Sequence, residues 1–120
     1  MKRRQEELLT VNRGAVILQP TEDYLHWAKN TPDPLPELTL DTLREESPVY
    51  LMPKFEFTED AEQWLRSNYR SMFVEGLRSW CTDEDSWPKD LSYETFRGFF
   101  NAHITSLVFD LDKGSLRRES

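Results

Sequence analysis

Two histidines are the side chains of this sequence best suited to acid–base chemistry. His26 precedes Trp27 in a stretch with helical spacing, and His103 stands before a run of apolar residues. Either imidazole could exchange a proton near neutral pH. If His26 or His103 lies beside a carboxylate in an aromatic-lined pocket, the protein could be a small enzyme or a ligand-binding domain that uses this histidine. A partly exposed packing or capping role is commoner for such histidines, so the enzyme hypothesis is the alternative.

Cys81 is the one cysteine, and it is followed by the acidic run at residues 83–85. Neighbouring carboxylates disfavour a thiolate, so we expect a poor nucleophile. A single cysteine also excludes an intramolecular disulfide and a cysteine-based zinc cluster.

Metal and phosphate motifs are missing from the sequence. The histidines do not occur in an H-E-x-x-H pattern, and the acidic pair Asp110 and Asp112 precedes a glycine at the wrong position for an EF-hand. The four glycines are isolated, which excludes a phosphate-binding loop. We therefore expect no cofactor and no metal.

The 15 aromatic residues are the most distinctive feature of the composition. They either fill the core of a small domain or, because Tyr and Trp favour interfaces, also form a contact surface. The second interpretation predicts a non-enzymatic protein-interaction domain that pairs with itself as a homodimer. The residues expected at this interface are Trp27, Tyr50, Trp87 and Tyr93.

The charge is acidic and uneven along the chain. Each terminal segment of ten residues holds three basic and two acidic side chains, so residues 11–110 hold nine of the 15 basic and 18 of the 22 acidic ones. This excess of acidic residues disfavours nucleic-acid binding, although Arg66, Arg70 and Arg78 could form a small basic patch. A further hypothesis is an acidic protein that occupies the nucleic-acid site of a basic partner.

The sequence also predicts a soluble, cytoplasmic domain without membrane contact. No apolar run approaches the roughly 20 residues that a membrane-spanning helix needs. Residues 1–10 combine three basic residues with Gln and Glu and lack the apolar stretch of a secretory signal.

Apolar spacing and capping residues predict seven elements. In chain order they are a strand at 12–19 buried on both faces, a helix from the Thr21 cap to Lys29, a helix at 40–46 capped by Thr39, a strand at 48–55, a helix at 58–80 capped by Thr58, a helix after the Ser92 cap, and a strand at 104–111. The helix at 58–80 has the clearest apolar stripe. Residues 104–111 also fit a continued helix, but their β-branched and aromatic residues favour a strand.

These elements predict a two-layer α+β domain of order βααβααβ, in which a three-stranded sheet is covered by the long helix and the shorter ones. Three prolines make residues 30–38 an extended surface connector, and Pro53 places the second strand at a sheet edge or strand end. The domain is expected to span residues 11–111, between a flexible lead (1–10) and a flexible tail (112–120).

Several local patterns, taken together, resemble a small family of bacterial hypothetical proteins. They are Asn12-Arg13-Gly14-Ala15-Val16, Pro20, Trp27, Tyr50-Leu51-Met52-Pro53, Trp87-Pro88, Phe96 and Phe100. The resemblance covers residues 11–111 and implies a bacterial, cytoplasmic, single-domain protein. It implies no activity, cofactor or site residue.

Overall fold

The computed structural model describes residues 8–32 and 35–119, in which three strands and four helices follow the expected order. The strands are β1 (Arg13–Pro20), β2 (Val49–Pro53) and β3 (Phe100–Thr105). The helices are α1 (Glu22–Lys29), α2 (Leu40–Arg44), α3 (Thr58–Arg78) and α4 (Tyr93–Phe99), and a 3-10 turn, η1 (Glu84–Ser86), precedes α4. The α+β prediction is confirmed.

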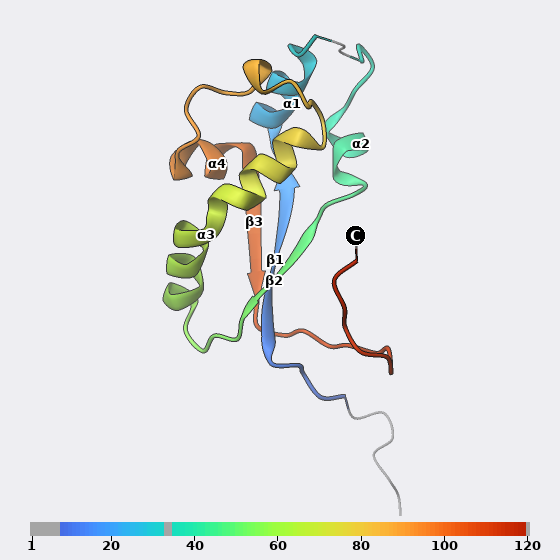
Figure 1. The fold of residues 1–120 in the computed structure, drawn as a ribbon, viewed down its shortest axis with the longest axis vertical. Helices are drawn as coiled ribbons and strands as arrows, with labels where there is room; N and C mark the ends of the chain where they lie inside the picture. Colours follow the sequence, from blue (N-terminus) through green and yellow to red (C-terminus); the bar gives the residue numbers. More distant parts are fainter. Residues whose placement is uncertain (1–7, 33–34, 120) are drawn as a thin grey trace, which may run out of the picture.

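The three strands form one antiparallel sheet in the order β2-β1-β3, with β1 in the centre (Figure 1). Val16 lies opposite Tyr50 on β2 and Ile104 on β3, and the alternation of side chains puts this row on one face of the sheet. That face is buried, because Val16 packs into the core together with the residues that lie two positions further along the strands on the same face. Pro53 ends the edge strand β2, as the sequence predicts.

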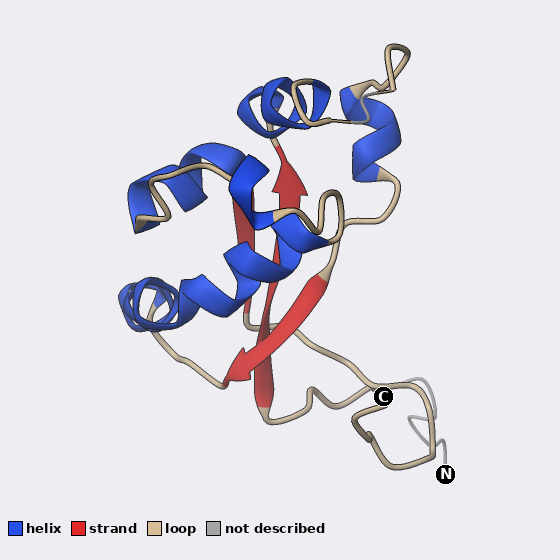
Figure 2. Ribbon diagram, turned by 45° about the horizontal axis from the view of Figure 1, so that its top comes forward, coloured by secondary structure: helices blue, strands red, loops and turns tan. Residues whose placement is uncertain are grey.

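The helices gather on one side of the sheet, as Figure 2 shows. The 21 residues of α3 run diagonally across the strands (Figure 1), and the predicted apolar stripe of this helix faces the sheet. Its fully or nearly fully buried side chains are Ala61, Leu65, Met72, Phe73 and Leu77. The long helix therefore supplies one wall of the core and the sheet supplies the other.

Phenylalanine rings join α3, α4 and β3 at the centre of this core. The ring of Phe73 lies 5.6 Å from that of Phe96 and 6.2 Å from that of Phe100, in tilted and edge-to-face arrangements. Such pairs add to the free energy gained by burying the rings. Tyr24 of α1 joins the cluster, with its ring 5.4 Å from Phe100.

The third strand does not lie where the sequence predicts it. We expected residues 104–111, but β3 begins at Phe100, and helix α4 passes into it without a loop. The N–H of Phe100 still bonds the Phe96 carbonyl, while the dihedral angles of Phe100 are already extended. Pairing with Pro20 at the end of β1 explains this, because the ladder fixes Phe100 as a strand residue.

The β1–β3 ladder ends at Thr105 and resumes further along with a shifted register. Ala15 pairs with Thr105, so an unshifted ladder would place Thr10 opposite residue 110, but Thr10 pairs with Phe109. The N–H of Val11 also donates to the Val108 carbonyl at 2.8 Å. Between these two pairs the N-terminal segment therefore holds one residue more than the segment that follows β3, as in a β-bulge, and the two terminal segments extend beyond the sheet as a pair.

The helix caps are partly as predicted. Thr39 and Ser92 accept hydrogen bonds from the backbone N–H groups of Thr42 and Thr95, which confirms both caps. Thr21 stands at the N-cap of α1, but its hydroxyl donates to the Gly98 carbonyl instead of capping the helix.

The Thr58 cap is a wrong prediction. Thr58 is the first helical residue of α3, and the N-cap is Phe57, which has extended dihedral angles and a side chain that cannot accept a hydrogen bond. The helix is nevertheless formed because its apolar stripe is buried, which outweighs the missing cap.

The remaining boundaries differ by a few residues, as is usual at the ends of elements. β1 was expected to be buried on both faces; on its second face Ala15 is buried, but Ile17 is half-buried and Gln19 is exposed. The connector at 30–38 has no helix or strand in its described residues, yet Thr31 and Leu38 are buried, so it is anchored rather than wholly at the surface. Residues 1–7 of the expected lead (1–10), residues 33–34 of the connector and residue 120 of the expected tail (112–120) lie outside the described residues.

Replacing the poor cap of α3 tests this helix start. The Phe57 side chain is 61% exposed, so Phe57→Ser loses little packing and gains a capping oxygen. We expect the free energy of unfolding to rise by about 1 kcal/mol in urea denaturation. Thr58→Ala is the matched control and is expected to change it by less than about 0.5 kcal/mol. A loss of about 1 kcal/mol in Thr58→Ala without a gain in Phe57→Ser would contradict this assignment.

Gly76 tests the packing between α3 and β3. A Cβ atom at Gly76 would lie 2.7 Å from the ring of Phe100, and that ring cannot move freely inside the aromatic cluster. We expect Gly76→Ala to lower the free energy of unfolding by about 1–3 kcal/mol despite the better helix propensity of alanine. Gly98→Ala in α4 is the control, since its nearest contact is 3.5 Å away, and it should be neutral or stabilising. Equal effects of the two substitutions would contradict this packing.

Candidate functional site

The two histidines lie on separate elements. His26 is exposed on α1 and lines a shallow hollow beside Trp27 and Trp87, whereas His103 is exposed on β3 opposite Ile17 of β1. His103 does not line the hollow that contains His26. The enzyme alternative, which places either histidine beside a carboxylate in an aromatic-lined pocket, has only the His26 hollow with Asp23 to build on.

Cys81 and the acidic runs show no sign of a reactive or metal-binding arrangement. Cys81 is half-buried, and its thiol contacts the Asp83 carbonyl at 3.8 Å. Within residues 8–32 and 35–119, no three His, Cys, Asp or Glu side chains converge as metal ligands would. Asp90 instead serves the start of α4, where the hydroxyls of Thr95 and Ser92 donate to it and lower the pKa of its carboxyl group.

Trp27 and Trp87, two of the four predicted interface residues, come together. They line the hollow between α1 and the loop before α4. Each indole N–H donates to a backbone carbonyl, Trp27 to Ser86 and Trp87 to Cys81, both at 2.8 Å. The two side chains are therefore fixed by the fold, and only part of each ring reaches the surface.

Tyr50 and Tyr93, the other two predicted interface residues, do not line this hollow. Tyr50 packs against the core, and burial together with the charge of Glu75 raises the pKa of its hydroxyl. Tyr93 packs edge-to-face on Tyr69 at 5.4 Å, and its hydroxyl accepts a hydrogen bond from Arg97. Both side chains are half-buried.

Two of the three arginines of the predicted basic patch, Arg66 and Arg78, lie far apart on α3. Arg66 lies 4.4 Å from the ring centre of Tyr93 and 3.7 Å from the Glu94 carboxylate. Arg78 lies 5.8 Å from the ring centre of Trp87. Arg66 and Arg78 are twelve positions apart in the helix, which is about 18 Å along the axis. Arg66 and Arg78 therefore do not belong to one patch, and each lies near a different aromatic ring.

Several exposed apolar side chains lie on β2 and in the C-terminal segment, and the sequence analysis did not assign them to an interface. Val49 and Leu51 on β2 are 59% and 42% exposed, and Phe109 and Leu116 are 45% and 73% exposed. We call these four residues the apolar surface. Leu51, Phe109 and Leu116 line a common hollow of about 390 Å³.

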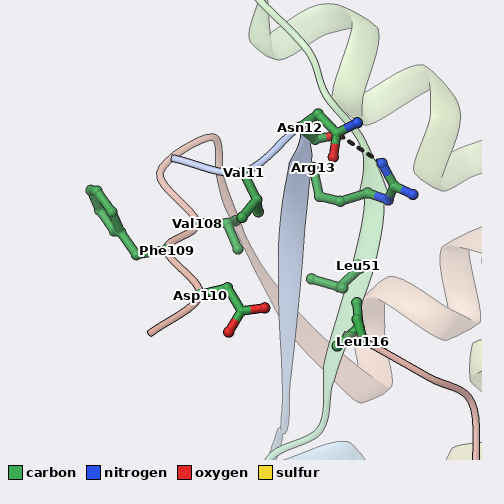
Figure 3. A pocket seen from close by; sticks show the side chains of 8 residues that line it. All are labelled: Val11, Asn12, Arg13, Leu51, Val108, Phe109, Asp110 and Leu116. Carbon is green, nitrogen blue, oxygen red and sulfur yellow. Dashed lines mark hydrogen bonds between the residues drawn. The ribbon is translucent and has the colours of Figure 1, made fainter. Parts of the chain in front are cut away.

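Figure 3 shows how this hollow is built. Leu51 of β2 and Leu116 of the C-terminal segment lie next to each other, and Val11 and Val108 meet beside the paired terminal segments. Phe109 projects away from the others into open space. The alternation of Val49 and Leu51 with Tyr50 and Met52 predicts two faces for β2, but it does not reveal which face the helices leave uncovered.

Comparisons with known proteins give no family for this chain. No protein-family model, no curated protein and no solved structure matches it. Helix length and composition give one further finding: among the described residues, even the longest helix lacks the apolar stretch that a membrane crossing requires.

The buried hydroxyl of Tyr24 makes the stability of the core depend on pH, and this dependence can be measured. This hydroxyl donates to the Gly76 carbonyl at 2.8 Å, and burial raises its pKa to about 12, with the Ser79 hydroxyl offsetting part of the effect. Because the unfolded tyrosine has a pKa near 10, the stabilisation from Tyr24 is complete below about pH 10 and is lost as the pH rises toward 12.

Tyr24→Phe isolates this contribution in urea denaturation at several pH values. Near pH 8 the variant should be less stable by about 1 kcal/mol, because the hydrogen bond is lost. By about pH 11 the wild-type protein should lose about 1.4 kcal/mol relative to the variant, which closes the gap. A gap that stays constant over this range would show that the Tyr24 pKa is not raised.

Proposed function

We propose that this domain acts through protein contacts rather than catalysis, and that it forms a homodimer through the apolar surface. The observation that supports the proposal is the uncovered face of the sheet, whose side chains alternate with those of the core. The residues of this face, read from the strand register, are Arg13, Ala15, Ile17, Gln19, Val49, Leu51, Pro53, Asn101, His103 and Thr105, of which Ala15 is buried. The helices cover the other face (Figure 2).

Charge favours a second copy as the occupant of this face. The chain carries a net charge of −7, so most pairs of surfaces from two copies repel each other. The ten outward residues of the sheet include no Asp or Glu, and residues 107–119 hold three acidic and three basic side chains. Two copies that meet through this surface therefore bring few carboxylates together, so like-charge repulsion is weaker there than between other surfaces of this acidic protein.

The size of the sheet requires the C-terminal segment to take part. Three strands spaced about 4.8 Å apart, with about five residues each, cover a footprint of roughly 250 Å². A stable interface buries about 800 Å² per partner. The exposed leucines at 107, 111 and 116 and Phe109 add the apolar area that the strands lack. A Cα radius of gyration of 17.3 Å, against about 14 Å expected for a compact chain of this length, fits terminal segments that extend away from the domain.

The same proposal includes a cytoplasmic location and no nucleic-acid partner. The core is built from aromatic rings and hydrogen bonds, and with one cysteine it needs no intramolecular disulfide. The net negative charge of residues 11–110 disfavours contact with the phosphates of a nucleic acid. Trp27, Tyr50, Trp87 and Tyr93 remain proposed contact residues only through the parts of their rings that reach the surface.

Sedimentation equilibrium tests the homodimer. From about 10 µM to about 1 mM, the wild-type mass should rise from 14.3 kDa toward twice that value. In the double variant Val49→Thr/Leu51→Gln, charge and strand propensity are kept while apolar area is lost, so the dissociation constant should rise about tenfold or more. Leu35→Gln is the matched control, because Leu35 is 50% exposed but lies outside the apolar surface.

Two results would contradict the proposal. A wild-type protein that stays at 14.3 kDa at the highest concentration does not self-associate. Equal weakening by Leu35→Gln and by the double variant would mean that association does not depend on the uncovered face.

A further inference from the structure

A second surface has a different chemistry from the apolar one. Trp27, Trp87 and Phe99 form the floor of a hollow of about 380 Å³, and Asp23, His26, Asn30 and Pro88 complete its lining. We call it the aromatic hollow. It involves α1, α4 and the loop between η1 and α4, and it shares no lining residue with the hollow at Leu51.

The hydrogen bonds of the lining decide what this hollow can recognise. Both indole N–H groups are already donated to backbone carbonyls, and the amide N–H of Asn30 donates to the His26 carbonyl at 2.7 Å. What remains is mainly the π faces of three rings, the Asp23 carboxylate and the Asn30 amide oxygen. These groups attract cations, whereas an anion or a peptide carbonyl would find two side-chain donors among the lining residues, the His26 ring and the second amide N–H of Asn30.

We infer that the aromatic hollow binds an arginine side chain presented by a partner protein. A guanidinium group stacks on aromatic faces and can bond a carboxylate with two parallel N–H groups, so it fits both the rings and Asp23. The chain itself shows this affinity, because Arg78 lies 5.8 Å from the ring centre of Trp87 although it does not line the hollow. The net charge of −7 adds long-range attraction for a basic partner.

The shape of the hollow favours a protein side chain over a small molecule. All of its lining residues are exposed or half-exposed, so it cannot enclose a free ligand in the way a small-molecule pocket does. An arginine that projects from another surface needs only one such shallow contact among several. This partner is distinct from the second copy in the proposed homodimer, and its binding does not depend on that dimer.

Indole N–H signals in NMR spectra of the ¹⁵N-labelled full chain provide the test. The probe is N-acetyl-arginine amide, added up to about 20 mM, and N-acetyl-citrulline amide is its neutral analogue of the same shape. We expect the arginine derivative to shift the signals of Trp27 and Trp87 and to leave those of Trp64 and Trp80 unchanged. The citrulline derivative should cause much smaller shifts.

A matched pair of variants separates the carboxylate of the hollow from general charge. Asp23→Asn should raise the dissociation constant about two- to fivefold, the range expected for one exposed ion pair. Glu22→Gln removes the same charge from the neighbouring exposed position of α1, outside the lining, and should have a smaller effect. Absence of shifts at Trp27 and Trp87, equal shifts with citrulline, or equal weakening by both variants would overturn the inference.

Discussion

The hydrogen bonds that large aromatic side chains make to distant backbone carbonyls are the constraint on which the rest of this structure depends. A ring can be buried at low cost only if its polar atom finds a partner. Trp27 donates to the Ser86 carbonyl, 59 residues away, and Trp80 to the Ala28 carbonyl, 52 residues away. Tyr24 adds a bond from α1 to α3. These bonds connect helices and loops in a chain that has no disulfide to connect them.

This use of the aromatic residues determines which surfaces are left for partners. Rings that serve the fold present only their faces to solvent, so the aromatic hollow can offer π systems but no indole donor. The exposed apolar side chains of the sheet are instead ones without polar atoms, Val49 and Leu51 of β2. The same physical rule therefore explains why the tryptophans are not fully exposed.

Local patterns in the sequence predict the type and order of the elements but not the points that depend on strand pairing. The stripe of α3 and the caps at Thr39 and Ser92 are local signals, and all three are confirmed. The start of β3 is not local, because Phe96 and Phe100 fit a continuing helix, and only the partner Pro20 makes Phe100 extended. Likewise, alternation along β2 gives two faces, but the helix-free face follows from the packing of α3.

The two proposed surfaces differ in the charge of the partner that each can accept. The uncovered sheet face includes no carboxylate, so a second copy of an acidic chain meets less repulsion there than at other surfaces. The aromatic hollow carries Asp23, so it disfavours another acidic surface of this chain and attracts a cation. Salt should therefore act differently on the two contacts. Screening weakens a contact steered by charge, whereas burial of apolar area is maintained or strengthened as the ionic strength rises.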